Sequence, residues 1–282
     1  MRLDNQRESS NVEDRRRMRV SGGGGIGIGT IVMVLVALYF GIDPSTVLNM
    51  GKGLGQSTSQ ESEAIPEDDE MGQFMAKVLG STEDTWGKVF KNAGYDYPAP
   101  KLVLFRGQTN TACGTGQAAM GPFYCPGDKK VYIDLAFYDE MKNRFKAPGD
   151  FSQAYVIAHE VGHHVQNLMG TSEKVQQARQ SARNEAQANQ YSVLLELQAD
   201  CYAGLWAHHA DGANRILEAG DVEEAMRAAA AIGDDALQKQ AQGYAVPDSF
   251  THGTSEQRMR WFNQGLKVGD VNKCDTFSAA SL

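Results

Sequence analysis

The chain of 282 residues lacks an excess of basic residues. Its 27 lysines and arginines stand against 35 aspartates and glutamates, a formal charge of −8, whereas domains that bind nucleic acid normally carry the opposite balance. Six of the arginines lie within the first 19 residues, so the rest of the chain is more acidic still. The charge balance therefore argues against nucleic acid as a partner.

Cysteine is also scarce, with four residues at Cys113, Cys125, Cys201 and Cys274. No two of them are separated by only two residues, which argues against a zinc ribbon. Four cysteines allow three disulfide pairings, one of which joins Cys113 to Cys125 and Cys201 to Cys274. Four buried free thiols are the alternative, so the sequence leaves the pairing open.

Long apolar runs are rare, and the one that stands out is 22–42, which carries no charge. As a helix of about 21 residues at 1.5 Å each it would span roughly 30 Å, the thickness of a bilayer's hydrocarbon core. A cleaved signal peptide is the main competing interpretation, but no clear cleavage site follows Phe40. A buried core helix is disfavoured by the glycines at its start, so we expect an uncleaved anchor.

The anchor sets the expected division of the chain. Arginine-rich flanks stay on the cytoplasmic side, so residues 1–21 are predicted to be a cytoplasmic tail and 22–42 a transmembrane helix. Residues 43–69 are rich in polar residues and glycine, which is typical of a flexible linker. The remaining 70–282 are predicted to form one exported domain, where disulfides persist.

Hydrophobic periodicity predicts several elements in this domain. Helices are expected over 69–93, 151–169, 171–209, 222–232 and 255–266, with Asp150 or Ser152 capping the second. Strands are expected over 101–106 and 130–135. Between them, prolines bracket 121–126, which is typical of a sheet edge. Phe123 and Tyr124 could there hold an extended peptide by strand addition, or the segment could be an ordinary braced loop.

The most informative pattern is His159-Glu160-Val161-Gly162-His163. Residues at i and i+4 share a helical face, so both imidazoles can reach one metal ion. Zinc held by neutral imidazoles lowers the pKa of its bound water to about 7, and the adjacent glutamate can take the water's proton. This is the chemistry of a zinc peptidase, but the pattern is short and needs further residues to support it.

A tetrahedral zinc with one bound water needs a third protein ligand. One class of zinc peptidase takes it from a histidine six residues after the motif, a position that holds Met169 here. A glutamate from a following helix is the alternative. Glu196 is the best candidate because apolar residues surround it, whereas Glu173 and Glu185 lie among polar residues. Asp200, one turn after Glu196, could accept a hydrogen bond from a ligating histidine.

The motif together with 121–126, 196–204 and 250–258 resembles the bacterial family of neutral zinc metallopeptidases called YpfJ-like, over nearly the whole chain. The glutamate–aspartate element and the later histidine also resemble membrane-linked zinc endopeptidases of the HtpX and CAAX-processing type. The resemblance implies that Glu196 is the third zinc ligand, that Asp200 supports the ligands from behind, and that His252 lies at the active site.

Three further residues can be judged from their surroundings. His252 lies in a polar segment before a helix, which suits a hydrogen-bond donor to an oxyanion, although a surface histidine is the alternative. Arg258 could orient substrate or support the fold. His164 points about 100° away from His163 on the helix and is not expected to bind the metal.

The sequence thus predicts an α+β fold of the zincin type, with a small sheet packed on the motif helix and a second helix carrying Glu196, preceded by one transmembrane helix. We expect one zinc ion per chain, bound by His159, His163 and Glu196. Glu160 is expected to be the general base and His252 the oxyanion stabiliser.

The expected function is hydrolysis of peptide bonds in exported or cell-envelope proteins by an enzyme anchored in the bacterial inner membrane. Its N-terminus would lie in the cytoplasm and its catalytic domain in the periplasm. The alternative is a zinc-binding assembly factor on the same scaffold with little or latent activity. In a latent enzyme, His252 or a neighbour would occupy the fourth zinc position.

Overall fold

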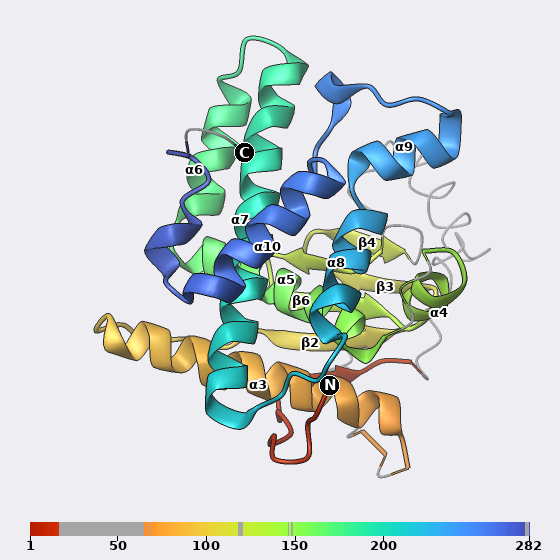
Figure 1. Cartoon of the computed structure of the whole chain (residues 1–282), viewed down its shortest axis with the longest axis vertical. Helices are drawn as coiled ribbons and strands as arrows, with labels where there is room; N and C mark the ends of the chain where they lie inside the picture. Colours follow the sequence, from red (N-terminus) through yellow and green to blue (C-terminus); the bar gives the residue numbers. More distant parts are fainter. Residues whose placement is uncertain (17–64, 67, 118–120, 146, 148, 280–281) are drawn as a thin grey trace, which may run out of the picture. The chain divides into compact units, whose positions relative to one another are not determined.

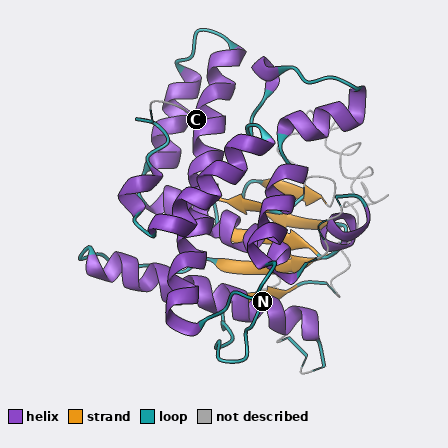
Figure 2. Ribbon diagram, in the orientation of Figure 1, coloured by secondary structure: helices purple, strands orange, loops and turns teal. Residues whose placement is uncertain are grey.

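In this computed structural model, described for all residues except 17–64, 67, 118–120, 146, 148 and 280–281, six strands form two sheets (Figures 1 and 2). The strands are β1 (Val12–Asp14), β2 (Lys101–Phe105), β3 (Gln108–Thr111), β4 (Gly114–Gln117), β5 (Phe123–Cys125) and β6 (Lys130–Asp134). The larger sheet has the order β1-β2-β6-β5, in which β5 alone runs antiparallel and forms one edge. β3 and β4 form a separate hairpin.

Both faces of the larger sheet are covered. Leu102 and Leu104 of β2 belong to the main core, whereas Val103 and Phe105 belong to a smaller cluster on the other face. A strand that is buried on both faces has a continuous apolar sequence, as 102–105 does. The sheet is therefore part of the core and does not present a solvated face along β2.

Helices make up most of the described structure. They are α3 (Glu70–Asn92), α4 (Ala136–Asn143), α5 (Asp150–Leu168), α6 (Thr171–Gln180), α7 (Glu185–Asn214), α8 (Asp221–Ala231), α9 (Asp234–Gln242) and α10 (Ser255–Val268). α5 contacts β5 and β6 as well as α7, and α7 packs along α10, as Figure 1 shows. The motif helix therefore lies between the sheet and the helix that carries Glu196, and the predicted α+β fold is confirmed.

Within the predicted domain 70–282, the elements differ from the structure in three respects. α5 is capped at Gly149 and not at Asp150 or Ser152. The predicted helix over 171–209 is wrong, because α6 ends at Gln180 and α7 begins only after Asn184. The side chain of Asn184 accepts a hydrogen bond from the backbone of Gln187 and so starts a new helix. The hairpin and the helices α4 and α9 were not predicted.

Residues 1–16 belong to the same compact unit as residues 65 onward. β1 pairs in parallel with β2, and the Glu13 carboxylate accepts hydrogen bonds from Lys130 Nζ (2.8 Å) and Arg15 Nη2 (2.7 Å). This differs from the predicted separate tail over 1–21. A single membrane crossing between residues 17 and 64 would put β1 and β2 on opposite sides, so a cytoplasmic N-terminus with an external domain is incompatible with this fold.

No structure is described for the segment that was predicted to be the membrane anchor. Residues 22–42, and all but the end of the linker over 43–69, lie outside the described residues. Among the described helices, none combines the length and the apolar character that crossing a membrane requires.

Two disulfides join Cys113 to Cys125 and Cys201 to Cys274. The first ties the β3–β4 hairpin to β5, and the second ties α7 to the C-terminal segment. The alternative of four free thiols is therefore wrong, since no cysteine is free. Disulfides persist in oxidising compartments, which favours a location outside the cytoplasm.

Replacing Gly80 of α3 tests whether the N-terminal segment packs on this helix. A β-carbon at Gly80 would lie 2.5 Å from the backbone oxygen of Arg7, so Gly80→Ala should lower the free energy of unfolding by about 1 to 3 kcal/mol. Gly87 lies in the same helix, and nothing lies within 4 Å of a β-carbon added there. Gly87→Ala should therefore stabilise the protein by about 0.5 to 1 kcal/mol. Urea unfolding measures both, and equal stabilisation by the two changes would contradict the packing.

Candidate metal centre

Helices α5 and α7 approach closely beside the motif. A β-carbon added to Gly162 would lie 3.1 Å from the carbonyl oxygen of Ala199 and 3.2 Å from its Cα. Glycine costs about 1 kcal/mol relative to alanine within a helix, and this close backbone approach explains why it is present. The approach brings Glu196, three residues before Ala199, opposite the motif.

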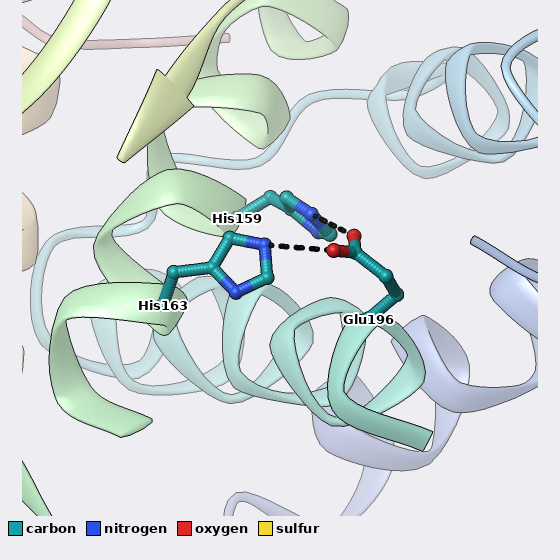
Figure 3. Close-up of side chains that lie close together, drawn as sticks. All are labelled: His159, His163 and Glu196. Atoms are coloured by element: carbon teal, nitrogen blue, oxygen red, sulfur yellow. Dashed lines mark hydrogen bonds and ion pairs between the residues drawn. The ribbon is translucent and has the colours of Figure 1, made fainter. Parts of the chain in front are cut away.

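Three side chains from these two helices converge, as Figure 3 shows. Glu196 Oε2 lies 3.1 Å from His159 Nε2, and Glu196 Oε1 lies 3.4 Å from His163 Nε2. One ligand atom from each residue lies within 4.8 Å of the others. Two imidazole nitrogens and a carboxylate oxygen are a donor set that suits zinc and leave one tetrahedral position for water. The residues present thus fit the metal that the sequence predicts, and His252 is not part of this cluster.

Asp200 supports His159 from behind, where the sequence placed it. Its fully buried carboxylate accepts hydrogen bonds from His159 Nδ1 (2.8 Å) and from the hydroxyl of Tyr155 (2.5 Å). Arg258 of α10 donates to the same carboxylate through Nε (2.9 Å) and Nη2 (3.0 Å). Arg258 therefore lies behind the candidate ligands and joins α10 to them.

The carboxylates make the pocket favourable for a cation. Burial acts to lower the pKa of His159, but Asp200 and Glu196 outweigh it and raise this pKa to about 10. Burial has the same effect on His163, and Glu196 again outweighs it and raises the pKa of that ring. Metal-bound imidazole must be neutral, so a proton and a metal ion compete for these nitrogens. The negative charges of Asp200 and Glu196 that favour a proton on these rings also favour a bound metal cation.

Glu160 lies beside the cluster on α5. It is buried, yet it lines the same cleft as the candidate ligands. Burial raises the pKa of its carboxylate, and the rings of His163 and His159 partly offset this rise. A carboxylate with a raised pKa accepts a proton more readily near neutral pH, which suits the predicted general base.

The candidate ligands line a cleft of about 650 Å³. Its other walls come from β5, α4, α6 and α9 and from the segments before and after α9. Apolar and aromatic side chains predominate in these walls, among them Pro122, Phe137, Val175, Ile232 and Leu237. A cleft of this size and composition can hold several residues of an extended peptide.

Phe123 and Tyr124 line this cleft and also make contacts within the domain. The ring of Phe123 stacks on Tyr132, with centroids 5.0 Å apart. The hydroxyl of Tyr124 lies 3.0 Å from His164 Nδ1 and accepts a hydrogen bond from Asn167 Nδ2 (3.1 Å). β5 forms a sheet edge, as predicted, so no strand of the described residues pairs with its outer side.

His252 lines the same cleft and is held by Asp234, which sequence analysis missed. Asp234 Oδ2 accepts hydrogen bonds from the backbone N–H groups of Thr251 (2.7 Å), His252 (2.6 Å) and Gly253 (3.0 Å). Asp234 Oδ1 lies 3.3 Å from His252 Nδ1, and this hydrogen bond raises the pKa of His252. Two consecutive aspartates before a short helical run were the available signal.

Removal of the Arg258 side chain tests how much the ion pair between Arg258 and Asp200 contributes to the stability of the domain. Arg258→Ala leaves the buried Asp200 carboxylate without its cation, so the free energy of unfolding should fall by about 3 to 5 kcal/mol. Arg260 lies in the same helix with its side chain exposed, and Arg260→Ala should change stability by less than about 0.5 kcal/mol. Urea unfolding measures both. Losses of similar size would argue against a special role for the Arg258–Asp200 pair.

Comparison with known proteins shows the family of the chain. A family model described as "Putative neutral zinc metallopeptidase" matches residues 1–277. "Uncharacterized protein YpfJ" of Escherichia coli K12 is 52% identical over 289 residues, which cover 98% of this chain and 99% of the relative. "Uncharacterized protein Rv2575" of Mycobacterium tuberculosis H37Rv is 38% identical over 264 residues, covering 87% and 86%. No solved structure matches the chain. The family description implies zinc, and the chain belongs to this family of neutral zinc metallopeptidases.

Proposed function

We propose that this protein is a zinc-dependent endopeptidase that acts on extended polypeptides. The observation that carries the proposal is the convergence of His159, His163 and Glu196 in a cleft that Glu160 also lines. Membership of a zinc metallopeptidase family supports the same activity.

His159, His163 and Glu196 would hold one zinc ion per chain. Zinc bound there would polarise the carbonyl of a peptide and lower the pKa of a coordinated water. The protein residues around it supply the proton transfers, the stabilisation of charge and the position of the substrate.

Glu160 is the group suited to the proton transfers. Its carboxylate would take a proton from the attacking water and deliver it to the amine that leaves when the peptide bond breaks. The raised pKa of the buried carboxylate favours its transient protonation between these two steps. One side chain can therefore act first as base and then as acid.

His252 is suited to stabilise the oxyanion that develops on the attacked carbonyl. Asp234 holds Nδ1 of the ring, which leaves Nε2 as the nitrogen that can donate into the cleft. The same hydrogen bond raises the pKa of His252 and favours the protonated ring, the better donor to a developing negative charge. Asp234 is therefore a positioning residue for this step.

The substrate would lie along the edge strand β5 and pair with its backbone. Apolar side chains of the substrate would fit against walls such as Phe137, Ile232 and Leu237. The two disulfides support a location outside the cytoplasm, so exported or cell-envelope proteins are the proposed substrates. Residues 1–16 lie on the same side of any membrane as the domain because β1 is part of its sheet, so attachment through residues 22–42 would have to leave both flanks of that segment on one side.

Cleavage of labelled unfolded casein by the purified full-length chain tests the activity. Glu160→Gln should lower the rate by about 10² to 10⁴-fold, because proton transfer is lost, while bound zinc is retained. Glu196→Gln should lose bound zinc together with activity. A chelator should abolish cleavage by the wild-type protein, and added zinc should restore it. Cleavage that persists unchanged in chelator and in Glu160→Gln would contradict the mechanism.

The pH dependence of kcat/KM tests the role of His252. Asp234 raises the pKa of His252, so activity that needs the protonated ring should persist at lower pH and fall as pH rises through that pKa. Asp234→Asn removes the carboxylate and should shift this alkaline limb to lower pH. Asp235→Asn changes the neighbouring carboxylate, which accepts hydrogen bonds from Ser255 and not from His252, and it should leave the limb in place. An alkaline limb that does not move in Asp234→Asn would contradict this role.

A further inference from the structure

The two candidate histidine ligands are supported by different chemical groups. His159 donates from Nδ1 to the Asp200 carboxylate, whereas His163 Nδ1 lies 2.8 Å from the amide oxygen of Gln166. Gln166 is fully buried and lies one turn after His163 on α5. The Nδ1 atom of His163 is therefore supported by a neutral amide, whereas the Nδ1 atom of His159 is supported by a carboxylate.

The orientation of the Gln166 amide follows from its other partners. Its Nε2 lies 2.7 Å from the backbone oxygen of Leu195, which can only accept a hydrogen bond. The amide nitrogen must therefore face Leu195, so the amide oxygen faces His163. Nδ1 of His163 must then carry the hydrogen, which leaves Nε2 as the nitrogen with a free lone pair beside Glu196.

A second buried amide continues this chain of hydrogen bonds. Gln198 Oε1 accepts from Gln166 Nε2 (3.2 Å), and Gln198 Nε2 donates to the backbone oxygen of Cys274 (3.0 Å). Backbone oxygens at Leu195 and Cys274 thus fix the direction of both amides. The far end is held in place because Cys274 is bonded to Cys201, one turn after Gln198 on α7.

Attachment of the C-terminal segment does not by itself require these amides. Thr276 Oγ1 donates to the backbone oxygen of Leu194 (2.6 Å), which ties the same segment to the same helix without a bond to His163. The Gln166–Gln198 chain differs in that it ends on a candidate metal ligand.

We propose that Gln166 and Gln198 are positioning residues that fix the tautomer and the angle of His163 for zinc, and that the Cys201–Cys274 disulfide holds the far end of this chain. The proposal rests on the metal site of the proposed function. According to this proposal, residues of α7 and of the C-terminal segment that do not bind the zinc themselves help to position the zinc ligand His163.

Zinc affinity of the full-length protein, measured by competition with a chelating dye, tests the proposal. Gln166→Met removes the acceptor for His163 and should weaken zinc binding about 10 to 100-fold. Gln198→Met preserves size but breaks the chain one step further away, and it should weaken binding about tenfold. Thr276→Val removes a buried hydrogen bond of the same segment and should leave the affinity unchanged. The Gln166→Met and Gln198→Met double variant should bind zinc no more weakly than Gln166→Met, because both act through one chain.

Alanine variants of the cysteines test the far end, since they create no thiols that could bind zinc. Cys201→Ala with Cys274→Ala should weaken zinc binding to about the level of Gln198→Met. Cys113→Ala with Cys125→Ala breaks the other disulfide, which has no bond to this chain, and should leave zinc affinity unchanged. The absorption spectrum of bound Co²⁺ should change in Gln198→Met and not in Thr276→Val, a readout that a change in stability alone does not move.

The outcomes separate this proposal from the proposed function. If the wild-type protein binds no zinc, the proposed function fails. The proposal is wrong, although the metal site stands, if the wild-type protein binds zinc and Gln198→Met binds it equally well. It is also wrong if the loss of zinc affinity in the double variant equals the product of the losses in Gln166→Met and Gln198→Met. If a glutamine variant does not fold, the variant with Cys201→Ala and Cys274→Ala tests the proposal instead. Zinc affinity and a Co²⁺ spectrum equal to those of the wild-type protein would then contradict it.

Discussion

The metal centre depends on one buried carboxylate, that of Asp200. An unpaired charge at this depth is costly, and the structure pairs Asp200 of α7 with groups from two other helices: Tyr155 and His159 of α5, and Arg258 of α10. Because every one of these bonds also fixes a helix, the position of His159 cannot change without a change in how the helices pack. The geometry of the site and the stability of the domain are therefore properties of the same few bonds.

The motif helix also positions the wall of the cleft. His163 points to the metal cluster, while its neighbour His164, on another face of the same turn, contacts the hydroxyl of Tyr124 in β5 and the backbone oxygen of Pro98. Asn167 contacts the same tyrosine hydroxyl. One stretch of helix thus sets both the candidate zinc ligands and the edge strand where a peptide could pair. A histidine that is not a candidate ligand therefore has a structural reason to follow the motif.

The parts of the site that lie on periodic helices could be predicted from the sequence. His159, His163, Glu196 and Asp200 follow helical spacing within apolar surroundings, and the structure brings them together. Asp234 could not be found in this way, because its partners lie 17 to 19 residues away across a helix boundary that was not predicted. β1 was not predicted for a different reason. Its charged Glu13 does not indicate a buried strand, and this side chain is buried because it pairs with the distant Lys130. Burial that depends on a charge partner far along the chain leaves no local pattern.

The packing of the N-terminal segment has a consequence for the order in which a growing chain can fold. The backbone N–H of Arg2 bonds to the oxygen of Ile216 (2.8 Å), and β1 needs β2, which is made roughly ninety residues later. At about 5 to 20 residues per second, Arg2 waits on the order of 10 to 40 s for its partner to leave the ribosome. Until β2 has been made, β1 is a strand without a neighbour, and the charges of Glu13 and Asp14 protect it from pairing with another chain. The earliest residues to be made are thus among the last to reach their final place.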